Sequence, residues 1–145
     1  MAFDIDHHFK AYPLLAPPTA VDRIAERQWH VLVLLPDGYV PPQGGEGPAT
    51  IVIQHVPNPE GTSLEDWVKG DSRSNYKLAA EGAALEPVTV GGQVGVRYQH
   101  SGLYETDAVV VARGNDIFLF SASWLTPQDA TRAELQQLLS TVEFL

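Results

Sequence analysis

The stretch that decides the fold reads Ala-Val-Val-Val-Ala at residues 108–112, followed by Ile-Phe-Leu-Phe at residues 117–120. Both runs are rich in residues that favour β-strands, and neither alternates apolar with polar side chains. A strand with one face in water would alternate, so both faces of these strands are expected to be covered. The residues between them, Arg113-Gly114-Asn115-Asp116, are typical of a turn. A connection this short makes the two strands antiparallel neighbours within one sheet.

A hairpin is predicted immediately before this pair. Residues 88–90 and 94–98 alternate apolar and polar side chains, and Gly91-Gly92 between them is typical of a two-residue turn. Gly95 lies inside the second strand, where a glycine often marks a close approach of another part of the chain.

Two earlier strands are predicted at residues 29–35 and 50–56, separated by a Gly/Pro-rich loop at residues 41–48. Parallel neighbours would need a crossover helix between each pair of strands. No such helix is predicted within residues 85–124, so a parallel doubly wound sheet is excluded.

The first of two predicted helices begins near Thr62. Thr62 and Glu65 have the spacing of a capping box, in which each side chain accepts a hydrogen bond from a backbone amide at the start of the helix. Leu64, Trp67 and Val68 then fall on one face of the helix and form a surface that can pack on the sheet.

The second predicted helix has the clearest pattern. Thr126 is expected as its N-cap, Pro127 as its first helical residue, and Asp129 in the first turn, where the helix dipole favours an acidic group. Its apolar stripe consists of Leu135, Leu138, Leu139 and Val142. The sequence therefore predicts an α+β fold, in which an antiparallel sheet is flanked by helices as an α/β/α sandwich.

The division of the chain is expected to be simple. Residues 1–28 are predicted to form an irregular N-terminal lead-in, because prolines at 13, 17 and 18 interrupt any regular pattern. Residues 19–28 fit either a short helix or the approach to a strand. Residues 29–145 are predicted to form a single domain, which suits a chain of 145 residues.

Composition excludes several classes of function. The chain has 18 acidic and 9 basic residues and a net charge of −9, which argues against nucleic acid or an anionic membrane as a partner. The absence of cysteine excludes disulfides, thiol catalysis and Cys-ligated metals. No apolar run approaches the ~20 residues that a membrane span needs, and the first residues do not resemble a signal peptide. A cytoplasmic protein is expected if Met1 is the native start, and an exported mature domain is the alternative.

The order of these elements resembles the PsbP-like superfamily. The matching pieces lie at residues 29–39, 62–68, 88–97 and 141–144, and the resemblance covers roughly residues 29–145. This fold is shared by the photosystem II extrinsic protein, a nuclear Ran-GTPase release factor and many small bacterial proteins, some of them lipoproteins or type VI secretion chaperones. The resemblance implies an antiparallel sheet between helices and roles in binding and assembly rather than catalysis. It supplies no shared active site.

The residues themselves offer no catalytic constellation, and no cofactor, metal site or catalytic residue is predicted. Residues 4–8, Asp-Ile-Asp-His-His, contain four potential metal ligands, but a terminal segment would lose entropy on forming a site and is expected to be a solvated polar end. His30, His55 and His100 lie in or beside strands without a visible nucleophile, so structural or surface roles are expected. Dinucleotide-binding and P-loop motifs are absent.

Aromatic side chains give the candidates for partner binding. Trp67 and Phe118 are expected in the core, whereas Tyr98 and Tyr104 flank the turn at Ser101-Gly102 and are expected to be partly exposed. With Trp124, these two tyrosines are the predicted contact residues. The leading hypothesis is a non-enzymatic binding or assembly module of the chaperone type. It would recognise a protein partner through a sheet edge or through the end between Tyr98 and Tyr104. The alternative is a carrier that holds a small ligand or metal between helix and sheet.

Overall fold

The computed structural model describes residues 3–5, 9–11, 19–24, 30–35, 49–80 and 83–144. The helices are α1 (Leu64–Gly70) and α2 (Ala130–Ser140), with two short 3-10 helices, η2 (Ser72–Ser74) and η3 (Tyr76–Leu78). The strands are β1 (Phe3–Ile5), β2 (Phe9–Ala11), β3 (Thr19–Ile24), β4 (His30–Leu35), β5 (Ile51–Pro57), β6 (Glu86–Val90), β7 (Gln93–Ser101), β8 (Glu105–Arg113), β9 (Asp116–Trp124) and β10 (Glu143–Phe144).

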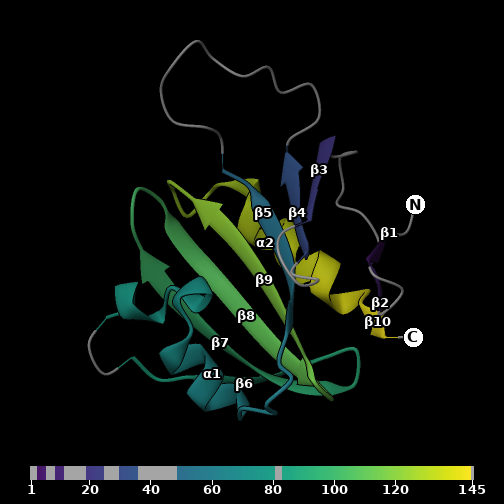
Figure 1. Cartoon of the computed structure of the whole chain (residues 1–145). Helices are drawn as coiled ribbons and strands as arrows, with labels where there is room; N and C mark the ends of the chain where they lie inside the picture. The colour runs from purple at the N-terminus through teal and green to yellow at the C-terminus, as the bar shows by residue number, and fades with distance from the viewer. Residues whose placement is uncertain are drawn as a thin grey trace.

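A seven-stranded antiparallel sheet dominates the fold, with the strand order β3-β4-β5-β9-β8-β7-β6 (Figure 1). β8 and β9 are the two apolar runs of the sequence. They pair antiparallel across the turn at Gly114, with Val109 opposite Phe120. β9 is the central strand, because β5 pairs with its other side. The fold is α+β, and the predicted antiparallel sheet is confirmed.

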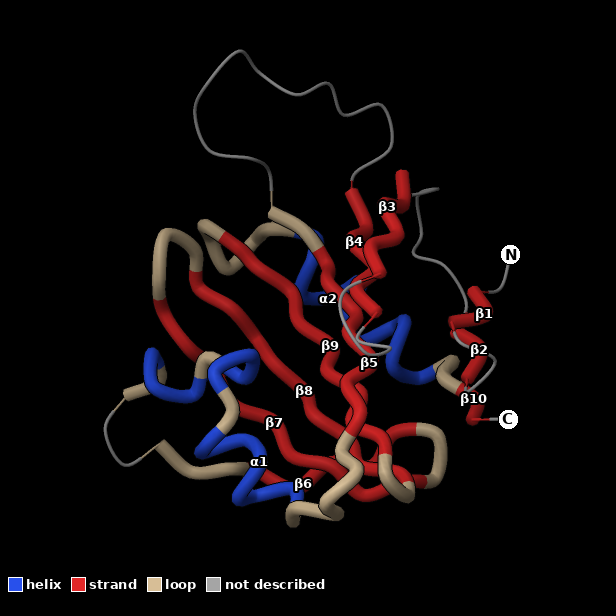
Figure 2. Tube along the Cα trace, in the orientation of Figure 1, coloured by secondary structure: helices blue, strands red, loops and turns tan. Residues whose placement is uncertain are grey.

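The two central strands send side chains into two separate apolar clusters. Val109, Phe118 and Phe120 alternate onto one face, which we call the α2 face because Leu135 and Leu138 of α2 belong to the same cluster. The intervening residues form the α1 face, where the cluster includes Trp67 and Val68 of α1 and consists of Val56, Trp67, Val68, Tyr98, Ala108, Val110, Ile117 and Leu119. Figure 2 shows α1 and α2 at different places along the sheet. Each fully buried Val, Leu, Ile or Phe contributes about 1.5–3 kcal/mol, so the unbroken apolar runs account for much of the stability.

Gly95 confirms the close approach predicted from the sequence. It pairs with Val111 of β8, and a β-carbon at Gly95 would stand 2.5 Å from the backbone oxygen of Val110. A side chain here would force β7 and β8 apart. The neighbouring hairpin turn also follows the prediction, since Gly91 and Gly92 both have positive φ angles.

The first helix begins one residue later than predicted, and the proposed capping box is wrong. Ser63 is the N-cap and accepts a hydrogen bond from the Asp66 amide at 3.3 Å, while the Glu65 carboxylate binds Lys69 at 2.6 Å. Thr62 is held in the preceding turn because the Asn58 side chain bonds both its amide and its carbonyl group. These two bonds hold the Thr62 backbone in the turn before the helix, and Ser63 is the residue that caps it.

The start of α2 also differs from the prediction. Asp129, not Thr126, is the N-cap, and the helix begins at Ala130. The Asp129 carboxylate accepts hydrogen bonds from the Leu125 and Thr126 amides at 2.6 and 3.1 Å, and these bonds lower its pKa. Thr126 and Pro127 therefore form a turn rather than the first helical residues. The predicted apolar stripe is buried, although Val142 lies just beyond the helix end.

The described parts of residues 1–28 are three strands, β1, β2 and β3, where the sequence predicted an irregular lead-in. β3 pairs with β4 and extends the main sheet, so residues 19–24 form a strand rather than a short helix. Residues 25–28 lie outside the described residues. β1 and β2 join β10 in a separate three-stranded sheet. Prolines 13, 17 and 18, on which the lead-in prediction rested, lie outside the described residues. Trp29 and the predicted loop at residues 41–48 lie outside the described residues.

Candidate functional site

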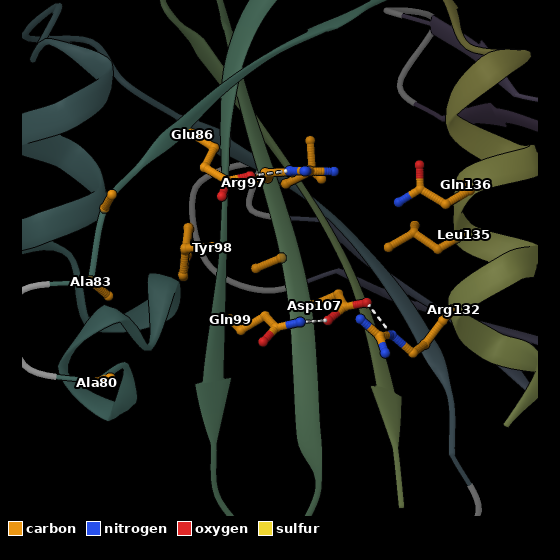
Figure 3. Close-up of a pocket in the computed structure, with 13 residues that line it drawn as sticks. Ala80, Ala83, Glu86, Arg97, Tyr98, Gln99, Asp107, Arg132, Leu135 and Gln136 are labelled. Carbon is orange, nitrogen blue, oxygen red and sulfur yellow. Dashed lines mark hydrogen bonds and ion pairs between the residues drawn. The ribbon is translucent and has the colours of Figure 1, made fainter. Parts of the chain in front are cut away.

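A groove of about 450 Å³ lies on the α2 face, between α2 and the segment that leads into β6 (Figure 3). β7 and β8 form its floor, because Arg97 pairs with Val109 and Gln99 pairs with Asp107 on this face. Arg132 and Leu135 of α2 line one wall, and the opposite wall carries the small side chains of Ala80, Ala83 and Ala84. The groove therefore has a polar floor, one wall of small apolar side chains, and a second wall that combines Arg132 with Leu135.

Asp107 ties the floor of the groove to α2. Its carboxylate accepts hydrogen bonds from Gln99 Nε2 at 2.9 Å, from Arg132 Nε at 2.8 Å and from Trp124 Nε1 at 3.3 Å. The Arg132 guanidinium also lies 4.4 Å above the centre of the Trp124 ring. Charge-assisted hydrogen bonds are stronger than neutral ones, so this network fixes the Trp124 ring and the N-terminal half of α2 against the sheet.

A second ion pair lies on the same floor but is open to solvent. Arg97 Nε donates to Glu86 Oε2 at 2.7 Å, and both side chains are more than half exposed. Exposed pairs of this kind contribute little to stability, about 0–1 kcal/mol. Both charges can therefore be rearranged by a molecule that enters the groove.

An exposed apolar surface adjoins the groove at one end of the sheet. Glu105 at the start of β8 pairs with Trp124 at the end of β9, so the residues just outside these two strands lie at the same end. Leu103 is 77% exposed and Leu125 is 59% exposed, and Tyr104 and Trp124 are half-buried. We call these four residues the apolar end. Contiguous exposed apolar side chains mark interaction sites on monomeric proteins.

The structure separates the predicted contact residues. Tyr104 and Trp124 both lie at the apolar end, whereas Tyr98 is only 5% exposed. Its expected exposure is wrong because strand alternation turns its ring onto the α1 face, where its hydroxyl donates to the Ser74 carbonyl at 2.6 Å. Burial raises the pKa of this hydroxyl. Tyr98 contributes to the lining of the groove but supports the fold more than it meets a partner.

Sequence reasoning missed four residues that build this region. Leu103 and Leu125 carry one signal that could have found them, since large apolar residues in turns are unusual. No sequence signal marks Asp107 and Arg132, because their hydrogen bond depends on how α2 lies across the sheet. The Trp67 and Phe118 predictions are confirmed, since both side chains are buried.

The histidines divide between the core and a second cavity. His55 is buried, stacks on Phe118 at 4.9 Å and lies 2.7 Å from Asp116 through its Nε2 atom, which is the structural role expected. His100 is also buried and lies on the α1 face. No group of three or more potential metal ligands occurs among the described residues. Asp6, His7 and His8 of the terminal acidic segment lie outside them.

Comparisons with known proteins show the fold alone. No protein-family model matches the chain, and no curated protein matches it. A crystal structure from Bacteroides thetaiotaomicron VPI-5482 has a TM-score of 0.54 and 12% sequence identity, over 94% of this chain and 45% of that chain. This chain therefore spans less than half of that protein.

A Pseudomonas aeruginosa protein of unknown function gives a TM-score of 0.45 and 19% identity, over 86% of this chain and 94% of that chain. That score is too low to carry an argument about function. In the part of the chain that the structure describes, no helix is both long and apolar enough to cross a membrane.

Proposed function

We propose that this protein is a non-enzymatic binding or assembly module that holds a partner protein against the apolar end and the adjoining groove. The observation that carries the proposal is the exposure of Leu103 and Leu125 beside the half-buried Tyr104 and Trp124. Interfaces concentrate their binding energy in a few aromatic and arginine side chains. The apolar end supplies the aromatic pair, and Arg132 over the Trp124 ring supplies the arginine.

The architecture we propose for the module is a PsbP-like α/β/α sandwich. Its support is the order of the elements together with the two apolar clusters, one containing Leu135 and Leu138 of α2 and the other Trp67 and Val68 of α1. Such a scaffold holds the contact residues on strand ends and at the start of a helix. Rigid elements of this kind position a binding surface well, because little entropy is lost when the partner arrives.

The groove gives the partner a second, more specific contact. Asp107 is already hydrogen-bonded by three side chains, so it acts as the anchor of the floor rather than as a free acceptor. The exposed Glu86–Arg97 pair and the Gln136 amide lie along the same groove and are suited to bind backbone groups of an extended segment. Apolar anchors would thus set the affinity and polar floor groups would set the register.

Quantitative affinity capture with three forms of the full chain tests the proposal. The double variant Leu103→Ser/Leu125→Ser removes the exposed leucines without disturbing the core. Val94→Ser is the matched control, because Val94 is 70% exposed but lies at the opposite end of β7. We expect a partner that wild type and Val94→Ser retain and that the double variant loses at least tenfold. Equal recovery by all three forms, or recovery of no protein by wild type, would contradict the proposal.

A further inference from the structure

A second cavity, of about 200 Å³, lies on the α1 face and has a different chemistry from the groove. Strands β5, β7, β8 and β9 line it together with η2. Most of the side chains that line it carry hydroxyl, amide, imidazole or guanidinium groups; those used below are Arg73, Asn75, His100, Thr106 and Ser121.

The register of the sheet explains why polar groups gather here. His100 pairs with Thr106, Thr106 pairs with Ser123, and Ser121 pairs with Ala108, all on the α1 face. Further along the same face these positions become apolar and belong to the cluster that contains α1, as Val110 does, and Leu119 lies at the boundary and lines the cavity. The α1 face therefore changes from an apolar floor to a polar basin, which a purely structural sheet surface does not require.

His100 is the strongest sign that the basin binds something. Its side chain is only 9% exposed, and burial lowers its pKa, so the imidazole is neutral at physiological pH and offers one donor and one acceptor. Among the described residues neither ring nitrogen has a hydrogen-bond partner; the ring's neighbour is Tyr98, with centroids 6.2 Å apart. Buried polar groups are nearly always hydrogen-bonded, so the imidazole is suited to a bound molecule in the cavity that it lines.

Asn75 lies at the same basin in an unusual backbone conformation. Its φ angle is +55°, and it is the only residue other than glycine with a positive φ in the described part of the chain. Asn75 connects η2 to η3 and lines the cavity. Asparagine tolerates this conformation better than most residues, and such conformations occur often at ligand sites.

The charges around the basin indicate the kind of ligand. Arg73 donates from Nε and Nη2 to both carboxylate oxygens of Asp71, at 2.8 and 2.7 Å, so its charge is compensated within the protein. The remaining polar lining groups are neutral hydroxyls, amides and a neutral imidazole, which both donate and accept hydrogen bonds, and Val52 and Leu119 complete the wall. These lining groups suit a ligand with neutral hydroxyl groups better than they suit an anion or a metal ion. The volume lies below the ~300–1,000 Å³ of sites for drug-sized ligands, so the ligand must be small.

We propose that this basin binds a small neutral polyhydroxyl molecule, a polyol or monosaccharide, through His100, Thr106, Ser121 and Asn75. The site is distinct from the groove, which lies on the other face of the sheet, and it shares no lining residue with the apolar end. It gives the module a small-molecule ligand in addition to its protein partner.

Nuclear magnetic resonance titration of the ¹⁵N-labelled full chain tests this proposal, with glycerol, myo-inositol and glucose as probes. Acetate and phosphate are the anionic comparison. We expect saturable shifts from at least one of the three neutral probes, confined to amides near residues 73–75, 100, 106 and 121. Thr106→Val should weaken that binding about 3- to 10-fold, as expected for one lost hydrogen bond. Thr89→Val, at an exposed threonine of β6, should leave it within twofold.

Ser121→Ala supplies a second variant should Thr106→Val disturb β8. The absence of shifts with all three neutral probes up to 100 mM would overturn the proposal. Saturable shifts from acetate or phosphate alone would also overturn it, since the site would then be an anion site. Equal affinities in wild type, Thr106→Val and Ser121→Ala would show that the probes bind elsewhere.

Discussion

A methyl group added at Gly95 probes the tightest contact in the sheet. In Gly95→Ala the new β-carbon would lie 2.5 Å from the carbonyl oxygen of Val110 and 3.0 Å from Cγ2 of Val111. The first contact is with backbone, which has no rotamer to change, so β7 and β8 must separate locally. Overpacking of a dense interior costs about 1–3 kcal/mol. Alanine also reduces the entropy of the unfolded chain, which offsets up to about 1 kcal/mol. We therefore expect a net loss of about 1–2 kcal/mol.

Urea unfolding followed by circular dichroism measures this loss directly. For a chain of this length it corresponds to a fall in Tm of roughly 3–8 °C. Gly70→Ala is the matched control, because Gly70 ends α1 and a β-carbon added there would have nothing within 4 Å. Alanine is the better helix former by about 0.5–1 kcal/mol, so this control should be neutral or stabilising. A Gly95→Ala protein as stable as wild type would refute the close contact between β7 and β8.

Three further changes test the core and the buried polar groups. Phe120→Ala empties a fully buried position on the α2 face and should cost about 3–5 kcal/mol in urea unfolding; a loss below about 1 kcal/mol would contradict the packing described. Tyr98→Phe removes the donor to the Ser74 carbonyl and should cost about 1–2 kcal/mol, and no change would show that this bond is not made in solution. Burial lowers the pKa of His100 in the folded protein below the ordinary histidine value of 6.5. Below pH 6.5 the imidazole therefore takes up a proton more readily in the unfolded chain than in the folded protein. The stability that His100 contributes is therefore present above pH 6.5 and decreases as the pH falls, by at most about 1.4 kcal/mol per pH unit. His100→Gln should flatten the decline measured by urea unfolding between pH 6.5 and 5, and parallel declines in the two proteins would argue against a buried neutral imidazole.

The centre of the fold was predictable because its signals are local and strong. Unbroken apolar runs around Val110 and Leu119 can only be strands covered on both faces, and the short turn at Gly114 forces them to be antiparallel. Gly91 and Gly92 also predict the neighbouring hairpin, because two adjacent glycines favour a two-residue turn between antiparallel strands. Nothing outside these stretches is needed to infer the middle of the sheet.

The helix starts were harder to predict because capping depends on competition between nearby side chains. Thr62 and Ser63 are both good caps, and the choice between them follows from Asn58, which binds Thr62 four residues away. At α2 the Asp129 carboxylate accepts hydrogen bonds from the amides of Leu125 and Thr126, so the helix starts after Asp129 rather than after Thr126. Preferences of about 1 kcal/mol decide such boundaries, and tertiary contacts readily exceed that amount.

The candidate site could be predicted only in part. The register of β8 and β9, which the short turn between them nearly determines, places Tyr104 and Trp124 at the same end of the sheet. The burial of Tyr98 does not follow, since it depends on which face α1 and η2 cover. The groove itself depends on the distance between α2 and Ala83, Ala84 and Glu86, and a single sequence does not specify that distance.

Hydrogen–deuterium exchange of the full chain, alone and with the partner recovered by affinity capture, tests the central claim most directly. Docking at the apolar end predicts slower exchange at the amides of Leu103, Tyr104 and Leu125, with the hairpin at residues 91–94 unchanged. Slower exchange confined to β6, the edge strand of the sheet, would place the partner elsewhere and contradict the account.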